Sequence, residues 1–298
     1  MIAVAGATGY VGGLLCRRLR EEDRTVRALA RRPEGARDLA AAGCEVRRVD
    51  VLRPETLGPA LEGADVAYYL VHSMGRGAEG DFAERDRRAA RNFAAAAAAA
   101  GVRRIVYLGG LGEGSRHLDS RHVTAETLSE GEVPVAYFRA AAVIGAGSES
   151  FRTVFYLVRR LPVMVTPRWV TTRTQPIAAA DAVAYLAGAA DLATPADREV
   201  QIGGPDVTTY GGMLDELARA LGRRRPVRIT LPLLTPWLSS LWIGLVTPVD
   251  TGVARPLIEG LATETVVTDG TGMELFPNVP RTPLRDTLRE AAAAASRG

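Results

Sequence analysis

Short apolar runs alternate with longer amphipathic stretches through the first half of the chain. The short runs are rich in β-branched and aromatic residues, as expected of strands buried on both faces. They cover residues 2–4, 26–29, 45–49, 66–71, 104–108 and 135–138. Helical periodicity separates them, over residues 12–19, 36–42, 55–61, 82–100 and 123–129. This alternation predicts an α/β fold, a doubly wound parallel sheet (Rossmann fold) of six or seven strands with crossover helices.

The alternation loosens after Arg139. Helical patterns recur over residues 151–161, 177–190 and 213–221, with a glycine- and proline-containing turn at 203–206. We therefore expect a Rossmann core over residues 1–145. Residues 146–298 are expected to form a smaller C-terminal lobe, interleaved with late strands of the core.

One apolar segment runs from Ile229 to Val249 and carries no charge over its 21 positions. That length could cross a bilayer, but three prolines interrupt it, at positions 232, 236 and 248. The favoured interpretation is an apolar wall of a substrate pocket. Contact with a membrane surface or a partner protein through residues 229–249 is the alternative.

Charge and cysteine content exclude several functions. All 37 cationic side chains are arginine, so lysine-dependent Schiff-base and P-loop chemistry is excluded. The net charge is only +3 and is spread over both halves, which gives no reason to expect nucleic acid as a partner. Two cysteines, Cys16 and Cys44, make neither a disulfide framework nor a metal site. With no basic leader before the first apolar run, a cytoplasmic location is expected.

The strongest motif follows the first predicted strand and opens the first helix, reading Gly6-Ala7-Thr8-Gly9-Tyr10-Val11-Gly12. Gly6 would allow a tight turn, Gly9 a close approach to a diphosphate, and Gly12 close packing of helix on strand. The helix amides and dipole would then bind the phosphates without a lysine. The predicted cofactor contacts here are Gly6, Thr8, Gly9, Tyr10, Val11 and Gly12.

The end of the second strand indicates which dinucleotide is bound. An NAD site needs a carboxylate here for the ribose hydroxyls, whereas this chain has Arg31 and Arg32. Guanidinium groups suit a 2′-phosphate, so NADP(H) is preferred and NAD(H) remains possible. Asp50, after the third strand, could accept a hydrogen bond from the adenine amino group, or could cap the next turn.

Together, Gly6–Gly12, Asp50-Val51, residues 65–71 and residues 101–108 resemble the atypical short-chain dehydrogenases/reductases, and in particular the NmrA-like NAD(P)H-binding proteins. The resemblance covers about the first 145 residues. It implies NAD(P)H binding and adds Val51 and Leu70 to the expected cofactor contacts. The glycine motif is specific for a dinucleotide, but nothing in the pattern is specific for a substrate.

Active members of that superfamily use a serine after the fifth strand and a Tyr-x-x-x-Lys motif on the next helix. The corresponding positions here hold Gly109-Gly110, Leu118 and His122. A histidine could replace the missing proton donor, because imidazole titrates near neutral pH. His72, after the fourth strand, and His122 are the predicted catalytic residues and further cofactor contacts, although either could be only a structural residue.

The favoured function is NADPH-dependent reduction of a small hydrophobic carbonyl, enone or quinone-like substrate without the Ser-Tyr-Lys triad. Two non-catalytic alternatives stay open. The chain could be an NADP(H) redox sensor that changes its affinity for a partner, or a structural or assembly subunit that holds a nucleotide permanently.

Overall fold

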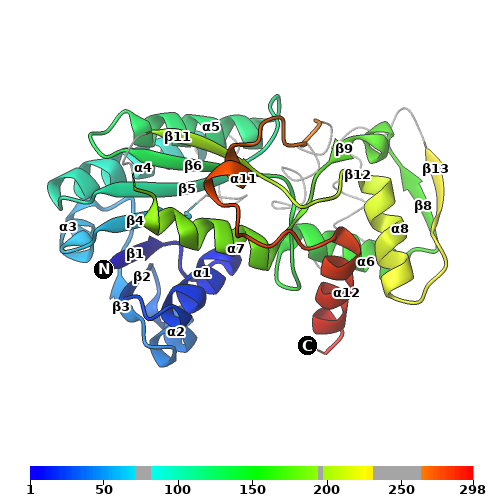
Figure 1. Cartoon of the computed structure of the whole chain (residues 1–298), viewed down its shortest axis with the longest axis horizontal. Helices are drawn as coiled ribbons and strands as arrows, with labels where there is room; N and C mark the ends of the chain where they lie inside the picture. Colours follow the sequence, from blue (N-terminus) through cyan, green and yellow to red (C-terminus); the bar gives the residue numbers. More distant parts are fainter. Residues whose placement is uncertain (72–81, 194–196, 231–262, 298) are drawn as a thin grey trace.

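The computed structural model describes residues 1–71, 82–193, 197–230 and 263–297. Its centre is a seven-stranded parallel sheet in the order β11-β6-β5-β4-β1-β2-β3 (Figure 1). The order reverses at β1, as in doubly wound dinucleotide-binding folds. The predicted Rossmann fold is therefore confirmed. Its strands are β1 (Ile2–Ala5), β2 (Val26–Ala30), β3 (Glu45–Arg48), β4 (Val66–Tyr69), β5 (Arg104–Gly110), β6 (Val135–Ala140) and β11 (Arg198–Ile202).

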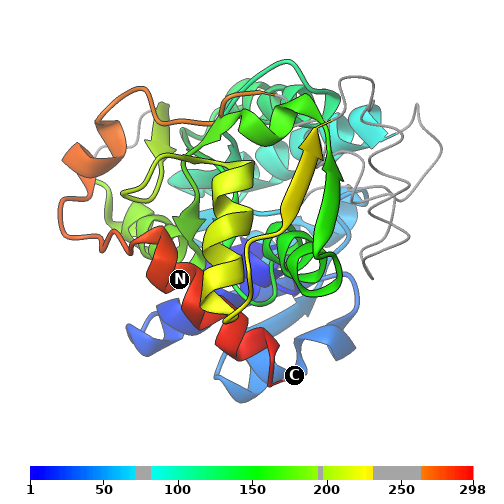
Figure 2. The same ribbon diagram turned by 90° about the vertical axis from the view of Figure 1, so that its right-hand side faces the viewer.

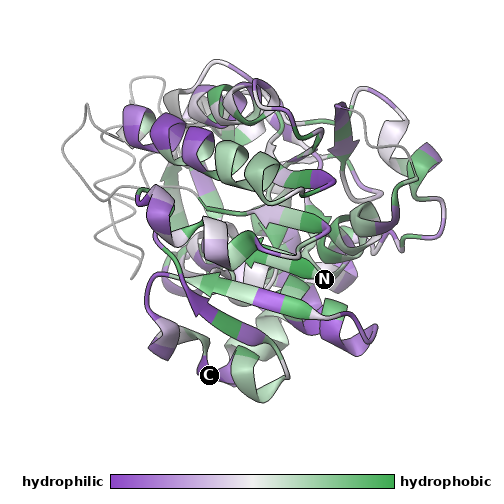
Figure 3. Cartoon of the chain, turned by 90° about the vertical axis from the view of Figure 1, so that its left-hand side faces the viewer, coloured by the Kyte–Doolittle hydropathy of each residue, from purple (hydrophilic) through white to green (hydrophobic). Residues whose placement is uncertain are grey.

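Helices cover both faces of this sheet, since the strands β1, β2, β4 and β6 are buried at every position and present apolar side chains on both sides. One face carries α1 (Tyr10–Glu21), α2 (Arg37–Ala41) and α7 (Ala179–Gly188). The other carries α3 (Gly58–Leu61), α4 (Phe82–Ala99) and α5 (Arg116–Ser129). Coloured by hydropathy, the strands are mainly green and the solvent-facing helix turns mainly purple (Figure 3).

A C-terminal lobe stands beyond the carboxyl ends of the strands, at the right of Figure 1, and is seen end-on in Figure 2. A third core holds it together, formed mainly by α6 (Glu149–Arg160), α8 (Tyr210–Ala220) and α12 (Leu284–Ala295). Short strand pairs complete it: β7 (Val143–Ile144) with β10 (Ile177–Ala178), β9 (Arg173–Thr174) with β12 (Thr208–Thr209), and β8 (Val163–Thr166) with β13 (Val227–Thr230). A five-residue helix, α11 (Thr271–Leu275), packs beside β11.

Several predicted elements change where local geometry overrides periodicity. The predicted helix 55–61 is split into a 3-10 turn, Pro54–Thr56, and α3. The predicted helix 123–129 begins seven residues earlier, at Arg116, because the Ser115 hydroxyl accepts a hydrogen bond from the Leu118 amide at 3.2 Å. The predicted helix 177–190 becomes β10, α7 and a 3-10 turn, Ala189–Asp191. Further 3-10 turns are Pro33–Ala36 and Arg168–Thr171.

The apolar segment 229–249 lies largely outside the described residues, which include only its first two positions, Ile229 and Thr230, at the end of β13. The predictions about a pocket wall or a membrane contact through this segment therefore stay predictions. Within the described ranges, no helix combines the length and the hydropathy needed to cross a bilayer.

Candidate functional site: the dinucleotide cleft

The glycine turn after β1 leaves no room for side chains at two of its positions. Gly6 has φ +83°, and an added Cβ would lie 2.5 Å from the Leu70 carbonyl oxygen. At Gly12, an added Cβ would lie 2.3 Å from the Gly6 carbonyl oxygen. The Gly9 amide donates to the Gly6 carbonyl at 2.9 Å and closes the turn. The sequence thus builds a cradle of bare backbone at the sheet's carboxyl edge.

The open end of this cradle is the N-terminus of α1. Gly9 is the N-cap residue, and no side chain in the described part of the protein accepts a hydrogen bond there. The first turn carries no acidic residue, so the positive pole of the 12-residue helix is not neutralised locally. The first amide to bond within the helix is that of Gly13, to the Gly9 carbonyl at 2.8 Å. Amides in this position fit a diphosphate, and Thr8 and Gly9 beside them are exposed.

The cradle lies at the point where the strand order reverses. β1 pairs with β2 on one side and with β4 on the other, and the Leu70 amide donates to the Ala5 carbonyl at 2.9 Å. Leu70, a predicted cofactor contact, is half-buried directly against Gly6. Open α/β sheets bind ligands in the crevice at such a reversal. The next predicted residue, His72, lies outside the described residues.

Arg31 and Arg32 follow β2 and are both exposed. Neither side chain has a hydrogen bond or ion pair with any described residue. The turn that follows them comes close to the cradle, since an added Cβ at Gly35 would lie 3.7 Å from the Thr8 methyl group. Two exposed guanidinium groups therefore lie near the cradle, at the end of β2. In folds of this kind, the adenosine ribose binds at the end of the second strand.

Asp50 adopts the turn-capping role that the sequence left open. Its Oδ1 accepts a hydrogen bond from the Leu52 amide at 3.0 Å, and its own amide donates to the Thr56 hydroxyl at 3.1 Å. Val51 is buried, and Asn92 of α4 donates to its carbonyl at 3.0 Å. The loop after β3 is thus held rigidly, with Asp50 half-buried at its start.

Tyr10 connects the cradle to the C-terminal half of the chain. Its ring fills the space beside two glycines: an added Cβ would lie 2.6 Å from the ring at Gly147 and closer still to the hydroxyl at Gly145. Burial raises the pKa of Tyr10, and a backbone hydrogen bond from Gly147 partly opposes this. The Tyr10 side chain therefore packs against protein, while its backbone belongs to the first turn of α1.

At the other end of the cleft, the chain's own side chains fill the positions of the missing serine and tyrosine. An added Cβ at Gly109 would lie 2.7 Å from the Tyr137 hydroxyl, and one at Gly110 would lie 2.5 Å from a Leu118 methyl group. Leu118 is buried at 7% exposure. Gly110 and Leu118, the predicted equivalents of a catalytic serine and tyrosine, thus pack together as an apolar contact.

His122 is held by hydrogen bonds at both ring nitrogens. Nδ1 lies 3.1 Å from the Tyr137 hydroxyl, and Nε2 lies 3.1 Å from the Gly112 carbonyl oxygen. With a proton on Nε2, the ring donates to Gly112 and accepts from Tyr137. With a proton on Nδ1, it donates to Tyr137, and Nε2 accepts from Arg139 at 3.2 Å. The structure thus places His122 within a hydrogen-bond network.

Two residues of that network were not among the predicted site residues. Arg139, at the end of β6, donates to Glu199 at 2.7 Å, and its Nη2 lies 3.2 Å from both His122 Nε2 and the Gly112 oxygen. Tyr137 stacks on Tyr107 with ring centroids 5.4 Å apart, and burial raises its pKa. In the sequence, these two residues could have been noticed as polar side chains at alternate positions of β6, which is otherwise apolar.

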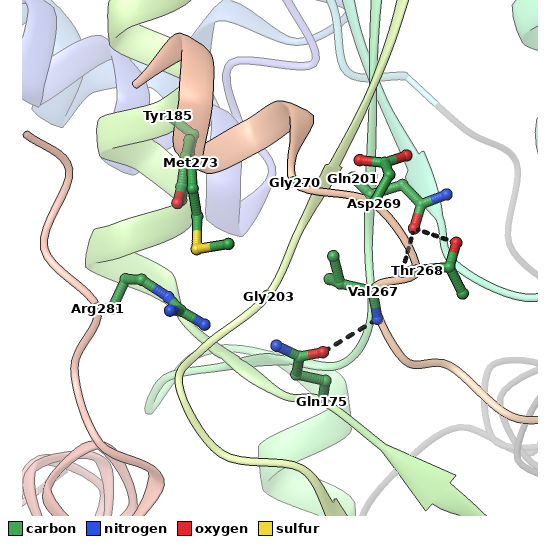
Figure 4. A pocket seen from close by; sticks show the side chains of 10 residues that line it. All are labelled: Gln175, Tyr185, Gln201, Gly203, Val267, Thr268, Asp269, Gly270, Met273 and Arg281. Carbon is green, nitrogen blue, oxygen red and sulfur yellow. Dashed lines mark hydrogen bonds between the residues drawn. The ribbon is translucent and has the colours of Figure 1, made fainter. Parts of the chain in front are cut away.

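A separate cavity of about 310 Å³ opens between β11, α7 and α11 (Figure 4). Tyr185, Met273 and Val267 give it apolar walls, and the Arg281 guanidinium stands at its edge. Gln175 is already bonded to the Val267 amide and the Gly204 carbonyl, at 3.0 and 2.7 Å. None of the predicted site residues lines this cavity, which is thus distinct from the cleft.

The parallel sheet, the glycine cradle at its reversal point and the positive helix pole define a Rossmann-type dinucleotide-binding protein. Residues 6–149 match the family model described as NAD(P)H-binding. This match supports the part of the predicted resemblance that concerns NAD(P)H binding. A search of curated proteins gives no match.

Solved structures share the fold over nearly the whole chain. The triphenylmethane reductase of Citrobacter sp. complexed with NADP(H) is 20% identical with a TM-score of 0.75, over 98% of this chain and 100% of that one. The NADPH-dependent quinone oxidoreductase of Escherichia coli complexed with NADPH is 21% identical with a TM-score of 0.75, over 97% and 98%. The UDP-glucuronic acid 4-epimerase of Bacillus cereus in complex with NAD is 14% identical with a TM-score of 0.76, over 99% and 98%.

Proposed function

We propose that the protein is an NADPH-dependent reductase of a small hydrophobic carbonyl, enone or quinone-like substrate. The observation that carries the cofactor preference is the pair of exposed guanidinium groups of Arg31 and Arg32 near the glycine cradle, which bond to none of the residues that the structure describes. No carboxylate takes their place at the end of β2, where NAD-specific sites hold the ribose hydroxyls. Two of the structural neighbours, the quinone oxidoreductase and the dye reductase, are complexes with NADPH or NADP(H).

In this proposal the residues act mainly by binding and orientation. The α1 amides hold the diphosphate, and Arg31 and Arg32 hold the 2′-phosphate through charge-assisted hydrogen bonds. Bound NADPH would supply a hydride to the electron-poor carbon or oxygen of the substrate. One proton from water or a histidine completes the reduction. Leu118 has no proton to give, so we assign the donor role to water or His72, with His122 as a cofactor contact.

The direct test measures NADPH oxidation with a panel of quinones and hydrophobic carbonyl compounds. We expect turnover with at least one class and slower turnover after His72→Ala. His117→Ala provides a matched control, since it also removes an imidazole. Absence of turnover across the panel, with NADPH bound, would overturn the reductase proposal.

A second function, NADP(H) sensing without turnover, is favoured by the Gly110–Leu118 contact, which replaces acid–base groups with an apolar one. A sensor must distinguish the two redox states, because a ligand shifts an equilibrium only through differential affinity. Titration calorimetry with NADP⁺ and NADPH then gives unequal affinities in a protein that oxidises no substrate. Equal affinities would exclude the sensor.

A further inference from the structure

The strand pair β8–β13 forms a parallel ribbon at the end of the molecule farthest from β3 (Figures 1 and 2). Its register places Val163 opposite Val227 and Val165 opposite Ile229. The Val227 amide donates to the Pro162 carbonyl at 3.0 Å where the ribbon begins. Within the described part of the chain, no third strand joins this pair.

The side chains of the ribbon alternate in the usual way, but the outward set is apolar. Met164 and Thr166 face the lobe core and are 3% and 6% exposed. The four outward residues, here called the ribbon face, are all β-branched. They are Val163, Val165, Val227 and Ile229, exposed by 50%, 39%, 61% and 50%. A two-layer structure normally puts polar residues on the side that faces water, so this face is unlike an ordinary solvent surface.

Arginines gather at one end of the ribbon face. Because the two strands are parallel, the residues that precede them meet at the same end: the Arg223 guanidinium donates to the Arg159 carbonyl at 2.7 Å. Arg159 and Arg160 lie over aromatic rings of α6, 5.8 and 5.1 Å from the ring centroids. Four exposed members of this group, here called the arginine end, are Arg159, Arg223, Arg224 and Arg225.

Among the described residues, no carboxylate forms an ion pair with Arg159, Arg223, Arg224 or Arg225. Residues 153–180 and 217–230 contain nine arginines and no aspartate or glutamate. The nearest acidic residues on α8 are already used: Asp215 pairs with Arg228 at 2.6 Å, and Glu216 pairs with Arg219. The lobe therefore presents a net positive end next to an apolar face, although the chain as a whole is close to neutral.

We propose that the ribbon face and the arginine end form a docking surface for an anionic lipid membrane. The four β-branched side chains would enter the boundary between headgroups and acyl chains, and the arginines would bind lipid phosphates. Lipid fits better than a second copy of this chain, because another copy would bring the same cluster of positive charges against this one. The proposal uses only residues up to Ile229 and does not depend on the reductase activity.

Sedimentation with lipid vesicles tests this surface. We expect the protein to pellet with vesicles of phosphatidylcholine plus phosphatidylglycerol, less with phosphatidylcholine alone, and less at high salt. Arg224→Gln with Arg225→Gln should weaken binding about 30-fold, from about 1 kcal/mol for each arginine near an anionic surface. Val227→Thr with Ile229→Thr keeps the β-branched shape and should weaken binding about tenfold.

The matched control is Arg88→Gln with Arg91→Gln, which removes two exposed arginines of α4. This helix packs against the central sheet and is not part of the lobe. It should bind vesicles as the unaltered chain does. The proposal is wrong if anionic vesicles fail to pellet the protein, or if the control loses as much binding as the Arg224–Arg225 variant. It is also wrong if light scattering shows a dimer that the Val227–Ile229 variant dissociates, since a second copy would then occupy the face.

Discussion

Glycines mark both ends of the dinucleotide cleft, but they serve opposite purposes. At the phosphate end, Gly6 and Gly12 bring backbone against backbone, with an added Cβ only 2.5 and 2.3 Å from carbonyl oxygens. At the opposite end, Gly109 and Gly110 make room for side chains of the same protein, those of Tyr137 and Leu118. The first pair leaves an open helix pole, and the second pair is filled by side chains at the positions where the resemblance predicted the missing serine and tyrosine.

The difference shows that a glycine in a cleft does not by itself indicate a ligand. What matters is whether the freed volume stays open. Backbone cannot retreat from an added methyl group, whereas a side chain can rotate or be trimmed by mutation. Substitutions at the two ends should therefore have different consequences, and the following predictions use that contrast.

The largest effect is expected from Gly12→Ala, which places a methyl group 2.3 Å from the Gly6 carbonyl oxygen. The turn must open, so the α1 amides lose their alignment, and NADPH binding should fall below detection in titration calorimetry. Gly13→Ala, one residue further along the helix, meets its nearest atom at 3.4 Å and should keep affinity. If both variants bind NADPH normally, the cradle is not the phosphate site.

The next effect concerns the cofactor preference. Arg31→Gln with Arg32→Gln should weaken the binding of NADPH by about 1.5–3 kcal/mol for each lost charge-assisted hydrogen bond. The binding of NADH should weaken by much less. The Arg88–Arg91 variant again controls for overall charge. Equal weakening of NADPH and NADH would show that these arginines do not bind the 2′-phosphate.

The effect of Gly109→Ala should be intermediate in size, and it should fall on the stability of the fold and not on cofactor binding. Its methyl group meets the Tyr137 ring and hydroxyl at 2.7 Å, so overpacking should cost about 1–3 kcal/mol of unfolding free energy in urea titrations. NADPH affinity should change little, in contrast to Gly12→Ala. Adding Tyr137→Leu should recover part of the stability. Full additivity of the two substitutions would contradict the packing of Tyr137 against Gly109.

The smallest effect is expected from Tyr137→Phe, which removes the hydrogen bond to His122 and should cost about 1 kcal/mol near neutral pH. Burial raises the pKa of Tyr137, so the folded protein keeps this proton at a pH where the unfolded chain releases it. That stabilisation is present below the unfolded pKa of about 10 and is lost as pH rises above it. The stability gap between the two proteins should narrow above pH 10, and a constant gap would contradict the burial of this phenol.

The sequence predicted the central sheet and the cradle well because both depend on local patterns. Buried parallel strands are short apolar runs, and the glycine spacing encodes backbone geometry directly. The network of Tyr137 and Arg139 was missed, since the alternation of polar residues along their strand does not show that this strand lies beside β5. The ribbon face was missed for a similar reason: residues 163 and 227 become neighbours only through the pairing of β8 with β13. His72 stays a prediction.

Tyr10 packs between Gly145 and Gly147 while its backbone stands in the first turn of α1. A ligand seated on that turn would therefore be coupled through one aromatic ring to the loop that leads into the lobe. Heating the protein should then give a single cooperative melting transition whose midpoint rises with coenzyme concentration. Replacing Tyr10 with alanine should reduce that rise in the midpoint.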